Sequence, residues 1–282
     1  MELLVRRAEV LALARLDAHE VLRSRWPAVV TLLYGVLAAL LTFAAMRESS
    51  VLGFTGTGRV LLSFAHGLLL LLPLLALAAT SQTLNRARED GSLELLFGQP
   101  VSPAGYYSAV TLVRTALLFV PLAALVALLP LLTRIAFGDA VPWGYLGRTL
   151  LVSAALLWAF VGIGMALSAH VAHQAKAAIL ALLIWAAAVA LVDFALIAVL
   201  LQWRLSAGSV FFLAALNPVQ CARMALLSGQ DPELSTFGPV GFFLAHRLGS
   251  AGLLWLGIAW PAACGWLCWL LGLHRFRRGD LV

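Results

Sequence analysis

Two histidines three residues apart, His170 and His173, form the first pair whose spacing could do chemistry. On one helix such a pair shares a face and could ligate a metal ion. Both stand at the end of an apolar run, however, and no third ligand lies near them in the sequence. Cys264 and Cys268 also share a helical face, but small packing residues explain them better than a soft-metal site. We therefore expect no metal site.

Nucleotide or hydrolytic chemistry has no support in the sequence either. A phosphate-binding loop needs a Lys in a Gly-rich turn, whereas the one Lys of this chain, Lys176, has no Gly near it. The Gly-rich segment 53–59 ends in Arg59, and neither Gly-x-Ser-x-Gly nor His-Glu-x-x-His occurs. We predict no catalytic residue and no cofactor in this chain, so that any ATP-driven work comes from a partner.

The composition is that of a membrane protein. Hydrophobic residues make up 62% of the chain and charged residues 11%, and the mean hydropathy is +0.97. Six apolar runs are long enough, at about 20 residues each, to cross a bilayer as helices. They lie near 27–46, 60–82, 109–133, 147–169, 177–201 and 249–273. Because these runs are continuous and do not alternate, the predicted fold class is all-α, a single domain over 1–282 with six transmembrane helices.

The segment 1–26 mixes arginines and acidic residues with apolar residues at helical spacing. This pattern predicts an amphipathic helix that lies on the membrane surface, and Trp26 and Pro27 mark the turn into the first span. An even number of spans places both ends of the chain on one side. Eleven basic residues lie on that side against seven on the other, which favours cytoplasmic termini. The net charge of +6 then reflects topology and anionic lipid, not nucleic acid.

Three of the polar residues inside the predicted spans are singled out: His66, Arg114 and Asp193. For His66 we expect a satisfied hydrogen bond between helices. Arg114 is expected to reach lipid phosphate or the loop around Glu89. An ionised carboxylate at Asp193 is costly in hydrocarbon, so we expect a structural pair with Arg148 or Arg134, and the alternative is a proton relay.

The outer segment 202–248 holds two apolar pieces, 210–216 and 237–245, that are too short to span. Such pieces are typical of re-entrant or interfacial helices. Between them, Asn217 and Pro218 predict the start of a further helix that a Ser-Gly pair ends. We expect this segment to meet the substrate or a periplasmic partner. The residues singled out for that role are Asn217, Pro218, Arg223, Phe237 and Phe242.

The polar break at 83–108 is the strongest functional signal. It reads Glu89-Asp90-Gly91-Ser92-Leu93-Glu94-Leu95-Leu96 and then Pro100-Val101-Ser102. A carboxylate, a Gly and a short Leu-rich helix predict a surface element that another protein binds and through which it can transmit force. We expect Glu89 and Glu94 to pair with basic groups of that partner. Leu93, Leu95, Leu96 and Phe97 are expected to fill an apolar cleft in it.

This stretch resembles the first cytoplasmic loop of ABC type 2 permeases, and the likeness extends to the lead helix, the six spans and the broken outer segment. The resemblance implies a permease of the bacterial inner membrane that works as a homodimer with two cytoplasmic ATPase subunits. Those subunits would bind the ATP and Mg²⁺.

A narrower likeness is to the NosY-type permeases of nitrous oxide reductase maturation. It rests on Leu52-Gly53-Phe54-Thr55, on Leu216-Asn217-Pro218 with Arg223, and on Leu227-Ser228-Gly229. It implies a periplasmic β-helical partner and a role in assembling the copper–sulfide centre of that reductase. The alternatives are an exporter of lipid, polysaccharide or antibiotic, and a membrane anchor without transport.

Overall fold

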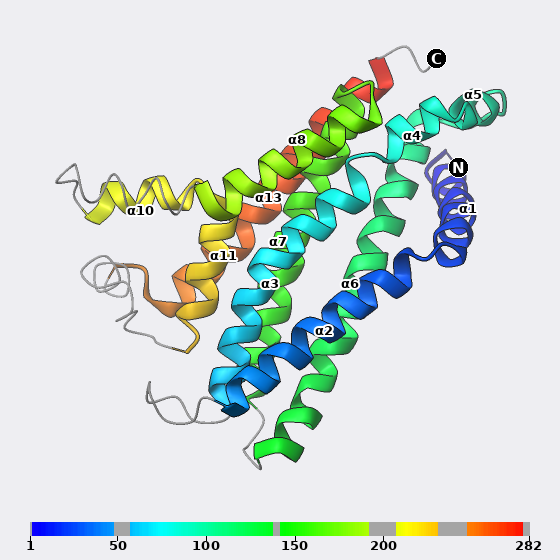
Figure 1. The fold of residues 1–282 in the computed structure, drawn as a ribbon. Helices are drawn as coiled ribbons and strands as arrows, with labels where there is room; N and C mark the ends of the chain where they lie inside the picture. The colour runs from blue at the N-terminus through cyan, green and yellow to red at the C-terminus, as the bar shows by residue number, and fades with distance from the viewer. Residues whose placement is uncertain (1, 48–56, 138–141, 192–206, 231–246, 279–282) are drawn as a thin grey trace.

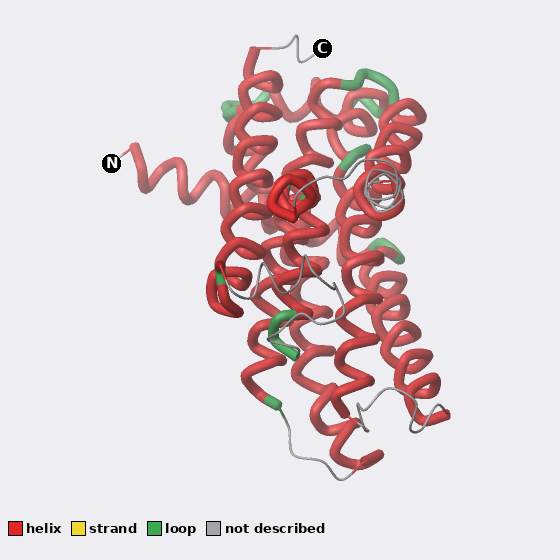
Figure 2. The backbone as a smooth tube through the Cα atoms, turned by 90° about the vertical axis from the view of Figure 1, so that its left-hand side faces the viewer, coloured by secondary structure: helices red, strands yellow, loops and turns green. Residues whose placement is uncertain are grey.

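The computed structural model describes residues 2–47, 57–137, 142–191, 207–230 and 247–278, and throughout these ranges the chain is helical with short turns (Figures 1 and 2). The long helices are α1 (Glu2–Arg23), α2 (Trp26–Arg47), α3 (Thr57–Thr80), α6 (Pro103–Phe137), α7 (Trp143–His170) and α13 (Gly249–Arg278). The shorter ones are α4 (Thr83–Glu89), α5 (Ser92–Phe97), α8 (Gln174–Ala186), α10 (Ala207–Ala215) and α11 (Pro218–Leu227). The all-α prediction is confirmed for this part of the chain.

Five stretches among the described residues are long and apolar enough to cross a membrane. They are Ser63–Glu89, Pro103–Leu128, Trp143–His170, Gln174–Leu191 and Gly249–Arg278. The first predicted span corresponds to α2, in which the described apolar stretch Trp26–Leu40 is shorter than the other five. The predicted number of six spans therefore stays a prediction.

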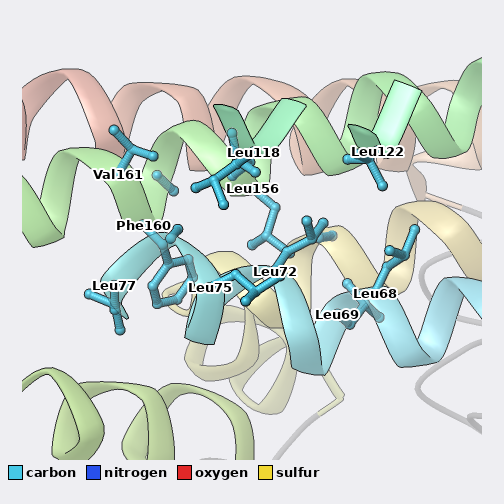
Figure 3. Close-up of a cluster of buried hydrophobic side chains, with 14 of the residues drawn as sticks. Leu68, Leu69, Leu72, Leu75, Leu77, Leu118, Leu122, Leu156, Phe160 and Val161 are labelled. Carbon is cyan, nitrogen blue, oxygen red and sulfur yellow. The ribbon is translucent and has the colours of Figure 1, made fainter. Parts of the chain in front are cut away.

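The apolar core lies where α3, α6 and α7 meet (Figure 3). Leu68 and Leu72 of α3, Leu118 of α6 and Leu156 and Phe160 of α7 are all essentially inaccessible. Leu68, Leu72 and Ala76 recur every four residues, so they form one stripe along α3. Since lipid gives helices no hydrophobic reason to associate, close packing of such stripes holds the spans together.

The contact between α7 and α13 depends on glycine. A Cβ at Gly265 of α13 would lie 2.7 Å from the carbonyl oxygen of Trp158 in α7, and one at Gly272 would lie 2.8 Å from the Cα of Ala166. Small residues let the two backbones approach closely, which is a common way of joining membrane helices. This pair anchors the last span to the centre of the bundle.

The beginning of α1, the end of α13, and α4 and α5 all lie at one end of the bundle (Figure 1). We call this the terminal end. At the same end, α1 leaves the bundle sideways and packs against α6 (Figures 1 and 2). An amphipathic helix beside the spans is the arrangement that the composition of 1–26 predicts.

Candidate functional site

The hairpin formed by α4 and α5 is the most prominent feature of the terminal end. Gly91 joins the two helices with φ 71°, in the left-handed region that glycine adopts without strain. The Ser92 hydroxyl donates a hydrogen bond to the Ala87 carbonyl at 3.0 Å and closes the turn. The predicted short helix is therefore present as α5, and it forms with α4 a helical hairpin of thirteen helical residues, 83–89 and 92–97.

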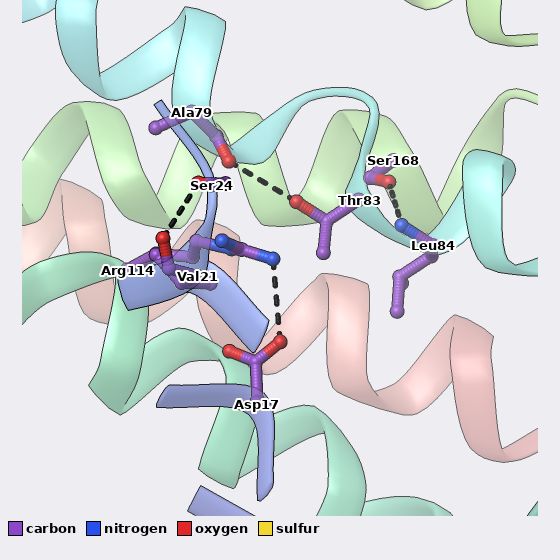
Figure 4. A network of polar contacts seen from close by, with 8 residues as sticks. All are labelled: Asp17, Val21, Ser24, Ala79, Thr83, Leu84, Arg114 and Ser168. Atoms are coloured by element: carbon purple, nitrogen blue, oxygen red, sulfur yellow. Dashed lines mark hydrogen bonds and ion pairs between the residues drawn. The ribbon is translucent and has the colours of Figure 1, made fainter. Parts of the chain in front are cut away.

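Buried polar contacts fix α4 to α7. The Leu84 N–H donates to the Ser168 hydroxyl at 2.8 Å, and that hydroxyl donates to the Asn85 side-chain oxygen at 3.3 Å (Figure 4 shows the first contact). Leu84, Asn85 and Ser168 are all fully buried. Because a buried N–H without a partner is costly, Ser168 stabilises the start of the hairpin.

The inner face of α5 belongs to this chain and not to a partner. Leu93 is 1% exposed, and Phe97 packs edge-on against Tyr106 of α6 with ring centroids 6.1 Å apart. Phe97 also lies 6.2 Å from the ring of Phe276 in α13. Leu93 is therefore turned into its own bundle, against the expectation that it enters a partner's cleft, whereas Phe97 is half-buried and its predicted contact with a partner stays a prediction.

The outer face of α5 carries the rest of the predicted contacts. Leu95 is 78% exposed, Glu94 is exposed beside it, and Leu96 is half-buried. An exposed leucine on α5, which lies outside the apolar spans, is a candidate anchor for another protein. We call Glu94, Leu95 and Leu96 the outer α5 face.

Glu89 has a partner within the chain. Its Oε1 accepts a hydrogen bond from the Gln174 N–H at 3.0 Å, at the start of α8. The Gln174 side chain in turn donates to the Gln82 side-chain oxygen at 2.8 Å. A carboxylate at a helix N-terminus satisfies a free N–H and is favoured by the helix dipole. Glu89 therefore caps α8 within the chain, and its side chain is still exposed, so the predicted pairing with a partner's basic group stays a prediction.

Two further contacts tie α1 to the beginning and middle of α6. Glu9 accepts hydrogen bonds from the Ser102 N–H at 2.6 Å and from the Ser102 hydroxyl at 2.8 Å. Arg114 lies 3.3 Å from the Asp17 carboxylate (Figure 4). The expected partners of Arg114, lipid phosphate or the Glu89 loop, are thus replaced by Asp17, because α1 passes directly over this part of α6. Burial raises the pKa of Asp17, although Arg114 beside it acts in the opposite direction.

Basic residues surround the hairpin at the terminal end. The Arg88 guanidinium lies 5.9 Å from the centre of the Phe276 ring, a cation–π geometry. Arg86 is 70% exposed and lies 3.5 Å from the Asp90 carboxylate one turn on. The last turn of α13 adds Arg275, Arg277 and Arg278. This concentration of positive charge agrees with the positive-inside rule, by which basic residues are enriched on the cytoplasmic side of the membrane.

The opposite half of the molecule holds α11, which the sequence placed in the outer segment. As predicted, Asn217 caps it by accepting from the Val219 N–H at 2.9 Å, and Pro218 occupies the first turn. Asn217 also donates to the Ala188 carbonyl at 2.6 Å, within a π-helical turn (Ala187–Leu191) that continues α8. One face of α11 packs against α7 and α13, so much of this helix is interior and not a free surface.

Arg148 of α7 is a junction that the sequence did not reveal. Its guanidinium donates to the Ala225 carbonyl, the Ser228 hydroxyl and the Ser250 carbonyl, each at 2.8 Å. These acceptors belong to the end of α11 and the beginning of α13. Carbonyls at a helix end need such a donor. From the sequence, Arg148 is named only as an expected partner of Asp193, which lies outside the described residues.

The remaining site residues are placed less centrally. His66 lies on α3 with its side chain exposed at the surface of the chain, and Arg223 is half-buried on α11. His170 is exposed and its Nδ1 donates to the Ala166 carbonyl at 2.8 Å. Asp193, Phe237 and Phe242 lie outside the described residues, so their predicted roles stay predictions.

Comparison with known proteins decides the family. The sequence profile described as ABC-2 family transporter protein matches residues 11–281, nearly the whole chain. The chain belongs to the ABC-2 transporter family. Two relatives of this permease are both named "Probable ABC transporter permease protein NosY". The one from Stutzerimonas stutzeri is 27% identical over 93% of this chain and 92% of its own length. The one from Pseudomonas aeruginosa is 30% identical over 95% and 98%.

The family and the fold agree. An ABC-2 permease is a membrane subunit and not itself the catalytic one, which fits the lack of catalytic motifs in the sequence. The likeness to NosY-type permeases over most of the chain agrees with the resemblance found in the sequence motifs. In this permease the α4–α5 hairpin is therefore the candidate coupling site.

Proposed function

We propose that this permease is driven by a separate cytoplasmic ABC ATPase that binds the α4–α5 hairpin. The observation that carries the proposal is the outer α5 face: Leu95 is 78% exposed on a hairpin that polar contacts tie to α7 and α8. Because of these contacts, a partner that displaces the outer α5 face also displaces α7 and α8. ATP and Mg²⁺ then belong to the partner, and the terminal end lies in the cytoplasm.

Co-purification with the ATPase tests this docking. Leu95→Asp removes the anchor while leaving the buried side of α5 intact, so we expect it to abolish recovery of the ATPase. Glu94→Ala, at the rim of the same face, weakens recovery only slightly, because exposed charges contribute less than apolar anchors. Leu93→Asp is the folding control, since it places a charge in the core and lowers the yield of folded permease.

Full recovery of the ATPase with Leu95→Asp, at normal permease yield, would place the docking surface elsewhere. ATP hydrolysis by the isolated permease would overturn the proposal that a separate subunit hydrolyses the ATP.

We further infer that the permease acts as a homodimer in the bacterial inner membrane and supports maturation of nitrous oxide reductase. The NosY name of its two relatives supports the maturation role, and the narrower motif likeness agrees with it, while the homodimer and the inner membrane follow from the family resemblance. In this proposal a β-helical periplasmic protein is the partner on the far side, and the copper–sulfide centre is the product of the pathway.

Deletion of the gene tests the biological role. The expected result is inactive nitrous oxide reductase that lacks its copper–sulfide centre, restored by the wild-type permease but not by Leu95→Asp. A deletion strain with active reductase and a defect in lipid, polysaccharide or antibiotic export would overturn the maturation role. Such a result would not contradict the proposed coupling to an ATPase.

A further inference from the structure

A second surface at the terminal end is a groove between α1 and α6. It has a volume of about 430 Å³ and also touches Pro27 at the start of α2. Its walls are apolar: Leu11, Ala18 and Leu22 come from α1, and Leu112 and Val120 come from α6. Among the described residues that line it, Arg15 is the one that carries a charge.

The groove opens on an exposed apolar surface of the described helices. Leu112 and Val120 are 57% and 63% exposed, and their spacing places them on one face of α6. Leu11 and Leu22 on the opposite wall are 55% and 69% exposed. Apolar walls of this kind at the side of a transmembrane helix are filled by hydrocarbon and not by water.

Polar contacts keep the groove open. Glu9 holds α1 to Ser102, and Asp17 holds it to Arg114, both on the side of α1 that meets α6. Ala14 and Ala18 line the groove and leave space that larger side chains would fill. These contacts hold α1 against α6 on the side away from the exposed walls, and the groove lies between the two helices.

Charge is distributed unequally around α1. Glu9 and Asp17 are engaged with α6, and Glu20 lines a separate polar cavity of about 290 Å³ next to α3 and α4. Arg15 lies on the other flank, where the described lining holds no acidic residue. A guanidinium at the rim of an apolar recess favours a ligand with one anionic group and a long hydrocarbon tail.

We propose that this groove binds an anionic phospholipid of the leaflet at the terminal end, with an acyl chain between α1 and α6 and the phosphate at Arg15. The lipid would fasten α1 to the bundle beside the coupling hairpin. The site does not depend on the identity of the transported substrate, so its test is independent of the proposed function.

Native mass spectrometry of the purified permease tests the site, with dioleoylphosphatidylglycerol and dioleoylphosphatidylcholine as probes of equal chain length. We expect the wild type to retain phosphatidylglycerol about five-fold better, from the contribution of one basic residue near the membrane surface. Arg15→Gln should remove this preference. Ala18→Phe should reduce retention of both lipids, because it fills the recess. Arg23→Gln, which changes an exposed arginine outside the groove lining, is the matched control and should keep the preference.

Equal retention of the two lipids by the wild type would overturn the proposal. So would an unchanged preference in Arg15→Gln together with unchanged retention of both lipids in Ala18→Phe, since only non-specific surrounding lipid would then be bound. A change of oligomer mass in Ala18→Phe would assign the groove to a second chain. Ala14→Phe provides a second plugged variant if Ala18→Phe does not fold.

Discussion

Phe97 of α5 and Phe276 of α13 lie with their ring centroids 6.2 Å apart, and this contact joins the candidate coupling helix to the last span. Tyr106 and Tyr107 of α6 complete the cluster, at 6.4 and 5.7 Å from Phe276. A force applied to α5 therefore reaches α6 and α13 through packed rings. The cluster connects the hairpin to these two spans, beside the hydrogen bond that joins α4 to Ser168 of α7.

Phe276→Ala should lower the free energy of unfolding by about 3–5 kcal/mol, because the ring is fully buried. Thermal unfolding in detergent measures this loss. Leu267→Ala on the same helix is the control, since that side chain is 59% exposed and its loss opens no cavity. A double-mutant cycle with Phe97→Ala should give a coupling of about 0.5–1.5 kcal/mol. Independent effects of the two changes would refute a direct link.

Glu89→Ala should destabilise the permease by about 1 kcal/mol, because the Gln174 N–H at the start of α8 loses its acceptor. Glu89→Gln keeps an oxygen at this position and should retain part of the stability. The measurement is the unfolding midpoint of each variant. If Glu89 instead served the ATPase, the two variants would lose co-purification at unchanged midpoints.

Asn217→Ala should cost about 1–3 kcal/mol, because it removes both the α11 cap and the donor to the Ala188 carbonyl. Asn217→Asp separates the two contributions: it keeps an acceptor for the Val219 N–H and loses the donor. We expect its unfolding midpoint to lie between those of the wild type and Asn217→Ala. An Asp variant as stable as the wild type would show that the contact with Ala188 contributes nothing.

The Asp17–Arg114 pair predicts an unusual dependence on pH. Because burial raises the pKa of Asp17 in the folded state, the folded chain holds this proton more tightly than the unfolded chain does. The stability that the protonated carboxyl contributes is present below its unfolded pKa, near 4. It is lost as the pH rises through the folded value.

Asp17→Asn should therefore be neutral or stabilising at pH 8, and its advantage over the wild type should shrink at low pH. Arg114→Gln should destabilise more at pH 8 than at pH 5, since it leaves an ionised Asp17 without its cation. Unfolding midpoints at the two pH values measure both effects. Equal losses for Arg114→Gln at pH 5 and pH 8 would show that Asp17 does not titrate in this way.

Much of the scaffold followed from local patterns. Apolar run length predicted α3, α6, α7 and α13, because a chain in hydrocarbon must satisfy its backbone within each helix. The cap at Asn217 followed from one residue type in front of a proline. These features depend on neighbours in the sequence and need no knowledge of distant contacts.

Only the tertiary structure decided which side chains are buried and which partners the polar residues contact. Helical spacing places Leu93 and Leu95 on different faces of α5 but does not say which face meets the bundle, since both side chains are leucine. The structure buries Leu93 and exposes Leu95. Glu89 and Arg114 likewise find their partners on α8 and α1, far along the chain. The sequence determined which segments become helices because that choice is local, whereas only packing determined which surface remains for another molecule.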